Sequence, residues 1–415
     1  MAGRRWVPVV VATALGLAAG AFALASSAST SQATKASKAA GSQTFMVNVD
    51  GRNPNINESF LAYFPRATTV HPGDTVVFKY VGVGEPHTVT FGTLANNAVS
   101  IYNHLTPAQQ NANTPPAALL AADNALPQAV SQTGQSVPSG ADKCFMRSGT
   151  PGQALCPNSQ HEQPVFDGSQ SYYNSGWLDA DQKFTVHLSS GIAPGTYRFM
   201  CLIHREDMAG KITVVPASKT IMSPTVQFAL GQKQLAAAEK PLVEPAALLA
   251  KGKPPIPHIT LPGPNPVLVG SGSPNTSGAI DQFGPRTVSI PVGGSVTWWI
   301  VGDHTITFNS NKSDDDIRQN EPDGTVQINQ KATAPAGGPG EPPPAKNAPT
   351  TGIHFKVVAS SSWNGQGFHN SGLFLNSFGP PVIEGYRLKF TRAGTYHYIC
   401  TVHDNMKGTV IVGGG

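Results

Sequence analysis

The sequence predicts an all-β protein built from two tandem β-sandwich domains with Greek-key connections and long loop insertions. Short runs rich in Val, Thr, Tyr and Phe alternate between apolar and polar positions and are bounded by Gly, Pro and Asp, a pattern typical of sandwiches and barrels. The chain of 415 residues is long enough for two or three domains, and its 43 Gly and 36 Pro provide for many turns. Three blocks of sequence occur twice in the same order, which indicates two homologous domains.

The internal repeat sets the expected domain boundaries. Each of three blocks in the first half has a similar block in the second: 72–91 with 292–308, 174–178 with 370–375, and 184–204 with 388–403. We therefore expect one domain at 44–216 and the other at 266–415. Each domain carries a long insertion, at about 94–171 in the first and about 309–354 in the second.

The N-terminal segment 1–25 is typical of an export signal. Arg4 and Arg5 precede an apolar run that ends in an A-x-A pattern at 23–25, as in a cleaved signal peptide. An uncleaved anchor is the alternative, because twenty apolar residues can just span a bilayer. Either way we expect an exported protein with an extracellular, periplasmic or cell-surface location. Residues 26–43, rich in Ser, Ala and Thr, should form a disordered tether, which an anchor would fix to the membrane.

The segment between the domains and the overall charge give two further expectations. Residues 217–265 should form a linker, with a short helix at 228–240 and a stiff Pro-rich connector at 253–266. The chain has a net charge of +4, only 13% charged residues and no basic stripe. We therefore expect no nucleic-acid partner.

The four cysteines fall into two groups. Cys144 and Cys156 lie twelve residues apart in one irregular region, so we expect a disulfide between them in an oxidising compartment. Cys201 and Cys400 lie in the two closing blocks of the repeat. They could instead pair with each other, but their separate and matching surroundings argue against a disulfide.

Strand periodicity indicates which side chains of the closing blocks point inward. In "GTYRFMC" and "GTYHYIC" a period of two puts two aromatic residues and the cysteine on one face, so Cys201 and Cys400 should face the core. The same alternation in "HTVTF" and "HTITF" aligns His87 and His304 with apolar neighbours. His397, three residues before Cys400, falls on the opposite face and is not expected to join a site.

Each half of the chain offers the same four soft side chains: an upstream His, a Cys-x-x-His pair and a Met three or four residues later. The two sets are His87, Cys201, His204 and Met208, and His304, Cys400, His403 and Met406. Two imidazoles, a thiolate and a weak axial thioether are the ligands of a blue (type 1) copper centre, so we expect two copper ions, one per domain. His and Cys also bind zinc, but the axial Met favours copper. Loss of one or both sites, leaving a purely structural fold, is the alternative.

These motifs resemble those of the cupredoxin family, which includes plastocyanin, amicyanin, pseudoazurin and azurin. The resemblance covers most of both halves outside the insertions and includes the closing pattern G-T-Y-x-x-x-C-x-x-H with its Met. It implies that the upstream His is the buried ligand. It also implies that His204 and His403, on the closing loops, are the more exposed ligands, through which electrons enter and leave.

The chain departs from the family at two kinds of position. Members usually have Asn after the upstream His, where this chain has Thr88 and Thr305; a hydroxyl could serve in a similar way. Many members have Pro before the loop His, where this chain has Ile203 and Val402. The second departure is expected to shift the copper potential.

The expected function is that of an exported copper-binding electron carrier, each centre cycling between Cu(I) and Cu(II) and serving an unidentified redox protein, with no enzymatic reaction. Copper storage or delivery is an alternative, because the ligands would be the same. A multicopper oxidase or nitrite reductase is a further alternative, but the chain has no His-x-His pair of the kind that holds additional coppers.

Overall fold

The structure is a computed structural model. It describes residues 36–37, 41–53, 55–110, 112, 114–128, 140–151, 156, 160–178, 181–255, 259–272, 277–311, 316–320, 326–336, 354–376 and 382–413. The predicted signal at 1–25 lies outside these residues. Within the described ranges no helix is both long enough and apolar enough to cross a membrane. In the predicted tether, strand β1 (Ala36–Ser37) pairs with β13 (Ile221–Met222), so these two residues differ from the expectation of disorder.

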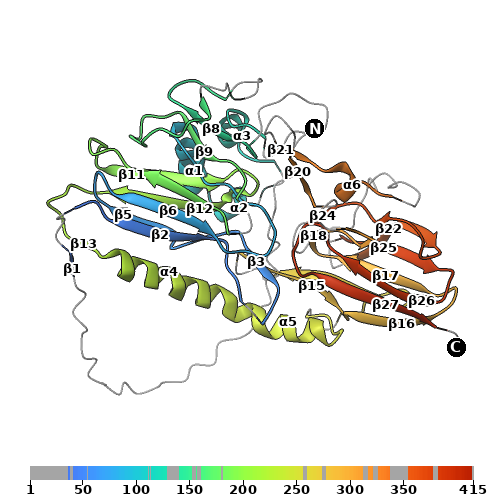
Figure 1. Ribbon diagram of the computed structural model, residues 1–415. Helices are drawn as coiled ribbons and strands as arrows, with labels where there is room; N and C mark the ends of the chain where they lie inside the picture. The colour runs from blue at the N-terminus through green and yellow to red at the C-terminus, as the bar shows by residue number, and fades with distance from the viewer. Residues whose placement is uncertain are drawn as a thin grey trace, which may run out of the picture.

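The first half of the chain forms a sandwich of two sheets (Figure 1). One sheet has the strand order β10-β6-β2-β4, with the bounds Lys183–His187, Thr75–Tyr80, Thr44–Val49 and Tyr63–Phe64. The other has the order β5-β12-β11-β7-β9-β8, with the bounds Ala67–Val70, Arg205–Val214, Gly195–Cys201, Thr90–Phe91, Tyr172–Ser175 and Lys143–Met146. Strands β2 and β6 are parallel, as are β5 and β12.

The second half forms a sandwich of related topology. One sheet has the order β22-β25-β17-β14-β15-β3, with the bounds His354–Trp363, Val382–Phe390, Ser295–Ile300, Pro266–Gly272, Gly278–Gly284 and Glu58–Phe60. The other has the order β16-β27-β26-β19-β23, with the bounds Thr287–Pro291, Lys407–Gly413, Gly394–Ile399, Thr307–Phe308 and His369–Asn370. The parallel pairs of the first sandwich recur as β14 with β17 and β16 with β27. The predicted all-β fold of two tandem sandwiches is therefore confirmed.

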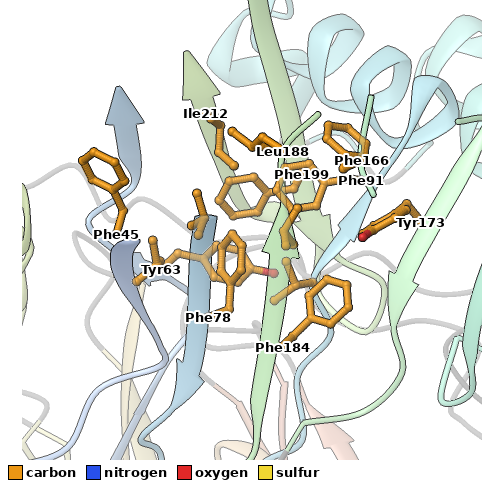
Figure 2. Close-up of a cluster of buried hydrophobic side chains, with 14 of the residues drawn as sticks. Phe45, Tyr63, Phe78, Phe91, Phe166, Tyr173, Phe184, Leu188, Phe199 and Ile212 are labelled. Carbon is orange, nitrogen blue, oxygen red and sulfur yellow. The ribbon is translucent and has the colours of Figure 1, made fainter. Parts of the chain in front are cut away.

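Aromatic side chains fill the core of the first sandwich (Figure 2). Strand β6 alternates half-buried and buried residues along its length, as the period of two requires, and points Phe78 inward. Its ring meets those of Phe91, Phe199 and Tyr63 edge-on, with centroids 5.7, 5.0 and 6.3 Å away. These contacts join strands of both sheets. They fix strand β7, which follows His87, and the end of β11, where Cys201 lies.

The two sandwiches share a seam. Strand β3 lies in the part of the chain assigned to the first domain but pairs with β15 of the second sandwich, with Phe60 opposite Gly278. Phe60, Phe64, Trp299 and Ile280 belong to one buried cluster there. The seam therefore joins the domains through both a sheet and a hydrophobic core.

The segment between the domains is more ordered than a linker with one short helix. It folds into α4 (Pro224–Glu239), a 3-10 turn (Lys240–Leu242) and α5 (Val243–Ala250). Helix α4 begins where the Ser223 hydroxyl accepts a hydrogen bond from an amide of the first turn, ahead of Pro224. Figure 1 shows α4 under the first sandwich and α5 under the second. Their apolar residues join the seam cluster, which the weak periodicity of the sequence does not reveal.

The insertions carry the remaining elements. The first contains α1 (Thr93–Asn103), α2 (Pro107–Gln110), α3 (Ala117–Asn124) and β8. A disulfide joins Cys144 to Cys156 there, with the Cα atoms 5.9 Å apart, which is the pairing expected from the sequence. In and near the second insertion lie β18 (Gly302–His304) with β24 (Phe374–Asn376), β20 (Arg318–Asn320) with β21 (Val326–Ile328), and α6 (Gln330–Thr333).

Candidate metal centres

Strand ends position the ligands of the first centre. Cys201 is the last residue of β11, and His204 lies in the turn between β11 and β12. His87 lies three residues before β7 and forms a bridge with Leu178. Met208 lies on β12 and is fully buried in the same hydrophobic cluster as Cys201. The sheet thus brings together residues more than a hundred positions apart.

The second centre is built in the same way. His304 ends β18, Cys400 directly follows β26, and His403 lies in the turn before β27. The Cys400 amide donates a hydrogen bond of 3.0 Å to the carbonyl of Met406, which closes this turn. Met406 is buried in the same cluster as Cys400. His397 lies on the exposed face of β26 with its Nδ1 3.0 Å from the Thr409 hydroxyl, as the periodicity predicts.

In each centre three ligand atoms form a compact triangle. In the first, His87 Nδ1 and His204 Nδ1 are 3.2 Å apart, and Cys201 Sγ lies 3.9 and 3.6 Å from them. In the second, Cys400 Sγ lies 3.8 Å from His304 Nδ1 and 3.7 Å from His403 Nδ1.

This geometry fits a single metal ion at each centre. Within each triangle all ligand atoms lie within 4.8 Å of one another. Edges of this length are what bonds of about 2.0 Å to nitrogen and about 2.3 Å to sulfur produce around one ion in a trigonal plane. With a buried Met in each cluster, the donor sets fit two copper ions, one per domain.

Two threonines hold the cysteines in place. The Thr88 amide points at Cys201 Sγ across 3.3 Å, and its hydroxyl accepts a hydrogen bond of 2.8 Å from the Leu202 amide. In the second centre the Thr305 amide lies 3.5 Å from Cys400 Sγ, and its hydroxyl accepts from the Thr401 amide at 2.9 Å. The threonines therefore tie the upstream His segment to the closing loop, which is the role expected for a hydroxyl at this position.

The repeated "NSG" block supports these threonines. The Thr90 hydroxyl donates to Asn174 Oδ1 at 2.9 Å and lies 3.1 Å from the Thr88 hydroxyl. In the second domain Thr307 lies 3.2 Å from Asn370 Oδ1 and 3.0 Å from the Thr305 hydroxyl. In both domains the block therefore anchors the hydrogen-bond chain that ends at the metal-binding loop.

The loop histidines are not the exposed ligands that the family resemblance implies. His204 and His403 are each only 3% exposed, against 0% for His87 and 1% for His304. Both loops are covered by tertiary contacts: the Asp404 amide, beside His403, donates to the Val83 carbonyl of the first domain, and Arg205, beside His204, donates to the Pro127 carbonyl of the first insertion. The expectation that His204 and His403 present exposed edges is therefore wrong, and the route of the electrons stays a prediction.

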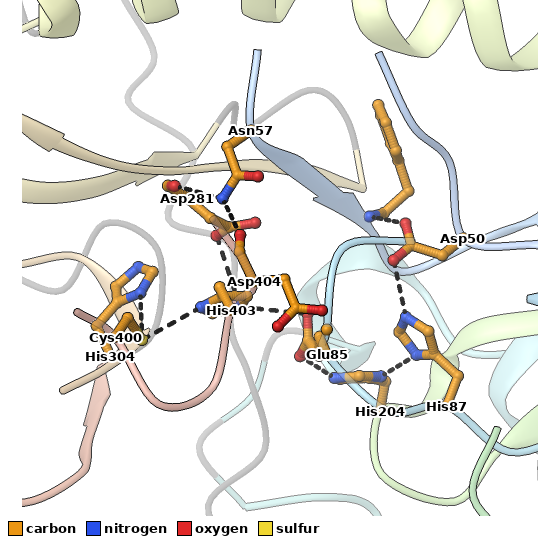
Figure 3. Close-up of polar contacts among 12 residues, drawn as sticks. Asp50, Asn57, Glu85, His87, His204, Asp281, His304, Cys400, His403 and Asp404 are labelled. Carbon is orange, nitrogen blue, oxygen red and sulfur yellow. Dashed lines mark hydrogen bonds and ion pairs between the residues drawn. The ribbon is translucent and has the colours of Figure 1, made fainter. Parts of the chain in front are cut away.

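Buried carboxylates contact the imidazoles on the side away from the thiolate (Figure 3). His87 Nε2 lies 3.3 Å from Asp50 Oδ2, and His204 Nε2 lies 2.7 Å from Glu85 Oε1. His403 Nε2 lies 3.7 Å from Glu85 Oε2 and 3.6 Å from Asp281 Oδ1. Carboxylates in this position fix the ring orientation and make the ligand nitrogen more basic.

Asp50, Glu85 and Asp281 were not among the site residues predicted from the sequence. Glu85 lies two residues before His87, so its nearness to a ligand was the available signal. Asp50 and Asp281 reach their imidazoles only through tertiary contacts. Asp50 lies 37 residues before His87, and Asp281 lies 122 residues before His403.

The charges of the site favour the metal-binding form of both cysteines. Burial by itself raises the pKa of Cys201, but His204 and His87 outweigh it and hold the pKa of this thiol well below its ordinary value. The pKa of Cys400 is likewise well below its ordinary value, because its two imidazoles outweigh burial. The thiolate is the form that binds a metal ion, so the protein presents it ready for use.

Comparison with known proteins gives a limited result. No protein-family model matches the chain, and no curated protein matches it. The solved structures that resemble it include cupredoxins. The reduced auracyanin of Roseiflexus castenholzii is 19% identical over 43% of this chain and 100% of its own, with a TM-score of 0.21. Auracyanin A of Chloroflexus aurantiacus, described as a "blue" copper protein, is 18% identical over 42% of this chain and 100% of its own, with a TM-score of 0.21.

A larger copper enzyme also resembles the chain. The copper-containing nitrite reductase of Thermus scotoductus is 12% identical over 90% of this chain and 68% of its own, with a TM-score of 0.20. Likenesses this slight transfer no function to the chain. The case for copper therefore rests on the two ligand triangles and their surroundings.

Proposed function

We propose that the protein is an exported electron carrier with two type 1 copper centres, formed by His87, Cys201, His204 and Met208 and by His304, Cys400, His403 and Met406. The observation that carries this proposal is the occurrence, twice, of a buried triangle of two Nδ1 atoms and one Sγ atom with a buried Met in the same cluster. When bound, copper would supply a one-electron Cu(I)/Cu(II) couple at each triangle.

The chain's own residues would keep each site rigid during redox change. The thiolates accept amide contacts from Thr88 and Thr305, and the imidazoles are oriented by carboxylates such as Asp50 and Asp281. A site whose thiolate and imidazoles are both held in place needs little rearrangement when its charge changes, which supports electron transfer. No covalent chemistry on a substrate is required, so we propose a carrier rather than an enzyme.

Export and an external redox protein complete the proposal. The signal-like segment at 1–25 and the Cys144–Cys156 disulfide both support an oxidising location outside the cytoplasm. The redox partner would dock away from the seam, because the ligand histidines His204 and His403 are covered. No nucleic acid is involved.

Copper loading of single-cysteine variants tests the metal sites. The exported portion should bind two copper ions and become intensely coloured by thiolate-to-copper charge transfer. Cys201→Ser and Cys400→Ser should each bind one ion fewer and lose part of the colour, as measured by metal analysis and visible absorption. A colourless copper-loaded wild type would contradict type 1 centres. A loss with only one of the two variants would mean that one domain lacks a site.

A further inference from the structure

The loop histidines of the two centres face one carboxylate across the seam. His204 Nε2 lies 2.7 Å from Glu85 Oε1, and His403 Nε2 lies 3.7 Å from Glu85 Oε2. Figure 3 shows the Glu85 side chain between the two imidazole rings. We propose that Glu85 couples the two metal centres into one redox unit, so that electrons pass between the domains inside the molecule. This proposal rests on the proposed function.

The backbone around Glu85 is built for a close approach of the two domains. Gly84 has a φ of +114°, and a Cβ there would lie 2.6 Å from the Asp404 amide nitrogen. That amide donates a hydrogen bond of 2.5 Å to the Val83 carbonyl. The Asn57 side chain donates to the carbonyls of Asp404 and Asp281, both at 2.8 Å. The metal-binding loop of the second domain is therefore docked on the segment that carries Glu85.

The bridge is screened from water. Glu85 is 9% exposed, and both imidazoles that it contacts are 3% exposed. Charge interactions are stronger in such a site than at a surface, because the effective dielectric constant is lower. In each ring Nδ1 faces the thiolate, so Glu85 contacts the ligand from the side opposite the metal-binding nitrogen. One carboxylate thus acts on both ligand sets.

The bridge belongs to the tandem arrangement and not to a single domain. The first half reads G-E-P-H where the second reads G-D-H, so the repeat supplies no second glutamate at this place. Among the residues that the structure describes, Glu85 has one carboxylate oxygen towards each loop histidine. Glu85 is therefore a positioning residue shared by the two centres.

The shared carboxylate has a defined consequence for electron exchange. In the exchange one centre loses an electron and the other gains it, no bond forms or breaks, and no proton has to move. External partners supply or remove only the net electrons. A change in the charge of one centre acts through Glu85 on the other, and the coupling free energy must be the same in both directions.

Single-centre variants allow the bridge to be tested at each end. Cys400→Ser leaves only the first centre and Cys201→Ser leaves only the second. Adding Glu85→Gln to each should raise the measured copper reduction potential in both backgrounds, because removing a negative charge destabilises the more positive oxidised state. Asp50→Asn should raise it only for the first centre, and Asp281→Asn only for the second, because these groups contact His87 and His403 respectively. Glu244→Gln, on the exposed side of α5, should change neither.

A second measurement needs no change at Glu85. In the wild type, the potential of the first centre should depend on whether the second is oxidised, and the reverse dependence should be equal in size. Reduction potentials that do not depend on each other would overturn the bridge. So would a Glu85→Gln change in reduction potential that occurs in only one of the single-centre variants, or that is no larger than the change caused by Glu244→Gln. Failure of both Cys201→Ser and Cys400→Ser to bind any copper would overturn the proposed function itself, and the bridge with it.

Discussion

Thr88 and Thr305 carry much of the local order at the two centres. Each uses its amide to contact a cysteine sulfur and its hydroxyl to accept the amide of the residue after that cysteine. Both groups are buried, so neither hydrogen bond can be replaced by water. Asn174 and Asn370 accept from Thr90 and Thr307, and so set the direction of the hydrogen bonds along the row of hydroxyls.

Replacing a hydroxyl by a methyl group tests this role. Thr88→Val keeps the shape of the side chain but leaves the Leu202 amide without its acceptor, because valine has no hydroxyl. We expect the free energy of unfolding of the metal-free protein to fall by about 1–3 kcal/mol, measured by urea denaturation. The visible absorption of the first copper centre should also shift. Thr88→Ser retains the hydroxyl and is the matched control; equal effects of the two variants would contradict the role.

At the scale of elements, strand β3 places a buried acid in the seam. Burial raises the pKa of Glu58 to about 8, and the nearby Glu239 and Asp50 carboxyls add to the shift. In an unfolded chain the same group ionises near pH ~4.3. Between these values the folded state holds more protons than the unfolded state, so the free energy of unfolding falls as pH rises.

The variant Glu58→Gln has no titrating carboxyl at this position. The part of the pH dependence of the free energy of unfolding that Glu58 causes should therefore be lost. The free energy of unfolding of the variant, minus that of the wild type, should grow as pH rises from about 4.3 to about 8 and stay level above. Urea denaturation of the metal-free proteins across this range measures the difference. The exposed variant Glu244→Gln is the control, and a Glu58→Gln difference that does not change with pH would contradict the buried, protonated state.

The elements also explain how much could be predicted from the sequence. Strand alternation and the repeat locate the cysteines and the upstream histidines, because these follow from a period of two within one strand. The exposure of His204 that the family resemblance implies is not found, because tertiary contacts, among them that of Arg205 with the Pro127 carbonyl, cover that loop. Strand β3 was not predicted, because its three residues carry little pattern. Helix α4 was predicted only in part, because its segment is weakly amphipathic. Glu85 has no counterpart in the repeat and could not be recognised as a bridge.

At the scale of the whole molecule, the two sandwiches should behave as one folding unit. Strand β3 completes a sheet of the second sandwich, and Phe60, Trp299 and Leu249 share a cluster that draws on both halves and on α5. We expect metal-free protein with its disulfide intact to unfold in a single calorimetric transition, with equal calorimetric and van't Hoff enthalpies. Two separate transitions would mean that the seam is too weak to join the domains.

The electron-carrier account is tested most directly by a redox titration of the copper-loaded protein, followed by its visible absorption. We expect two reversible one-electron steps per chain, with the colour lost on reduction and fully restored on oxidation. A protein that binds two copper ions but does not cycle between oxidised and reduced forms would contradict the carrier function and favour storage or delivery of copper.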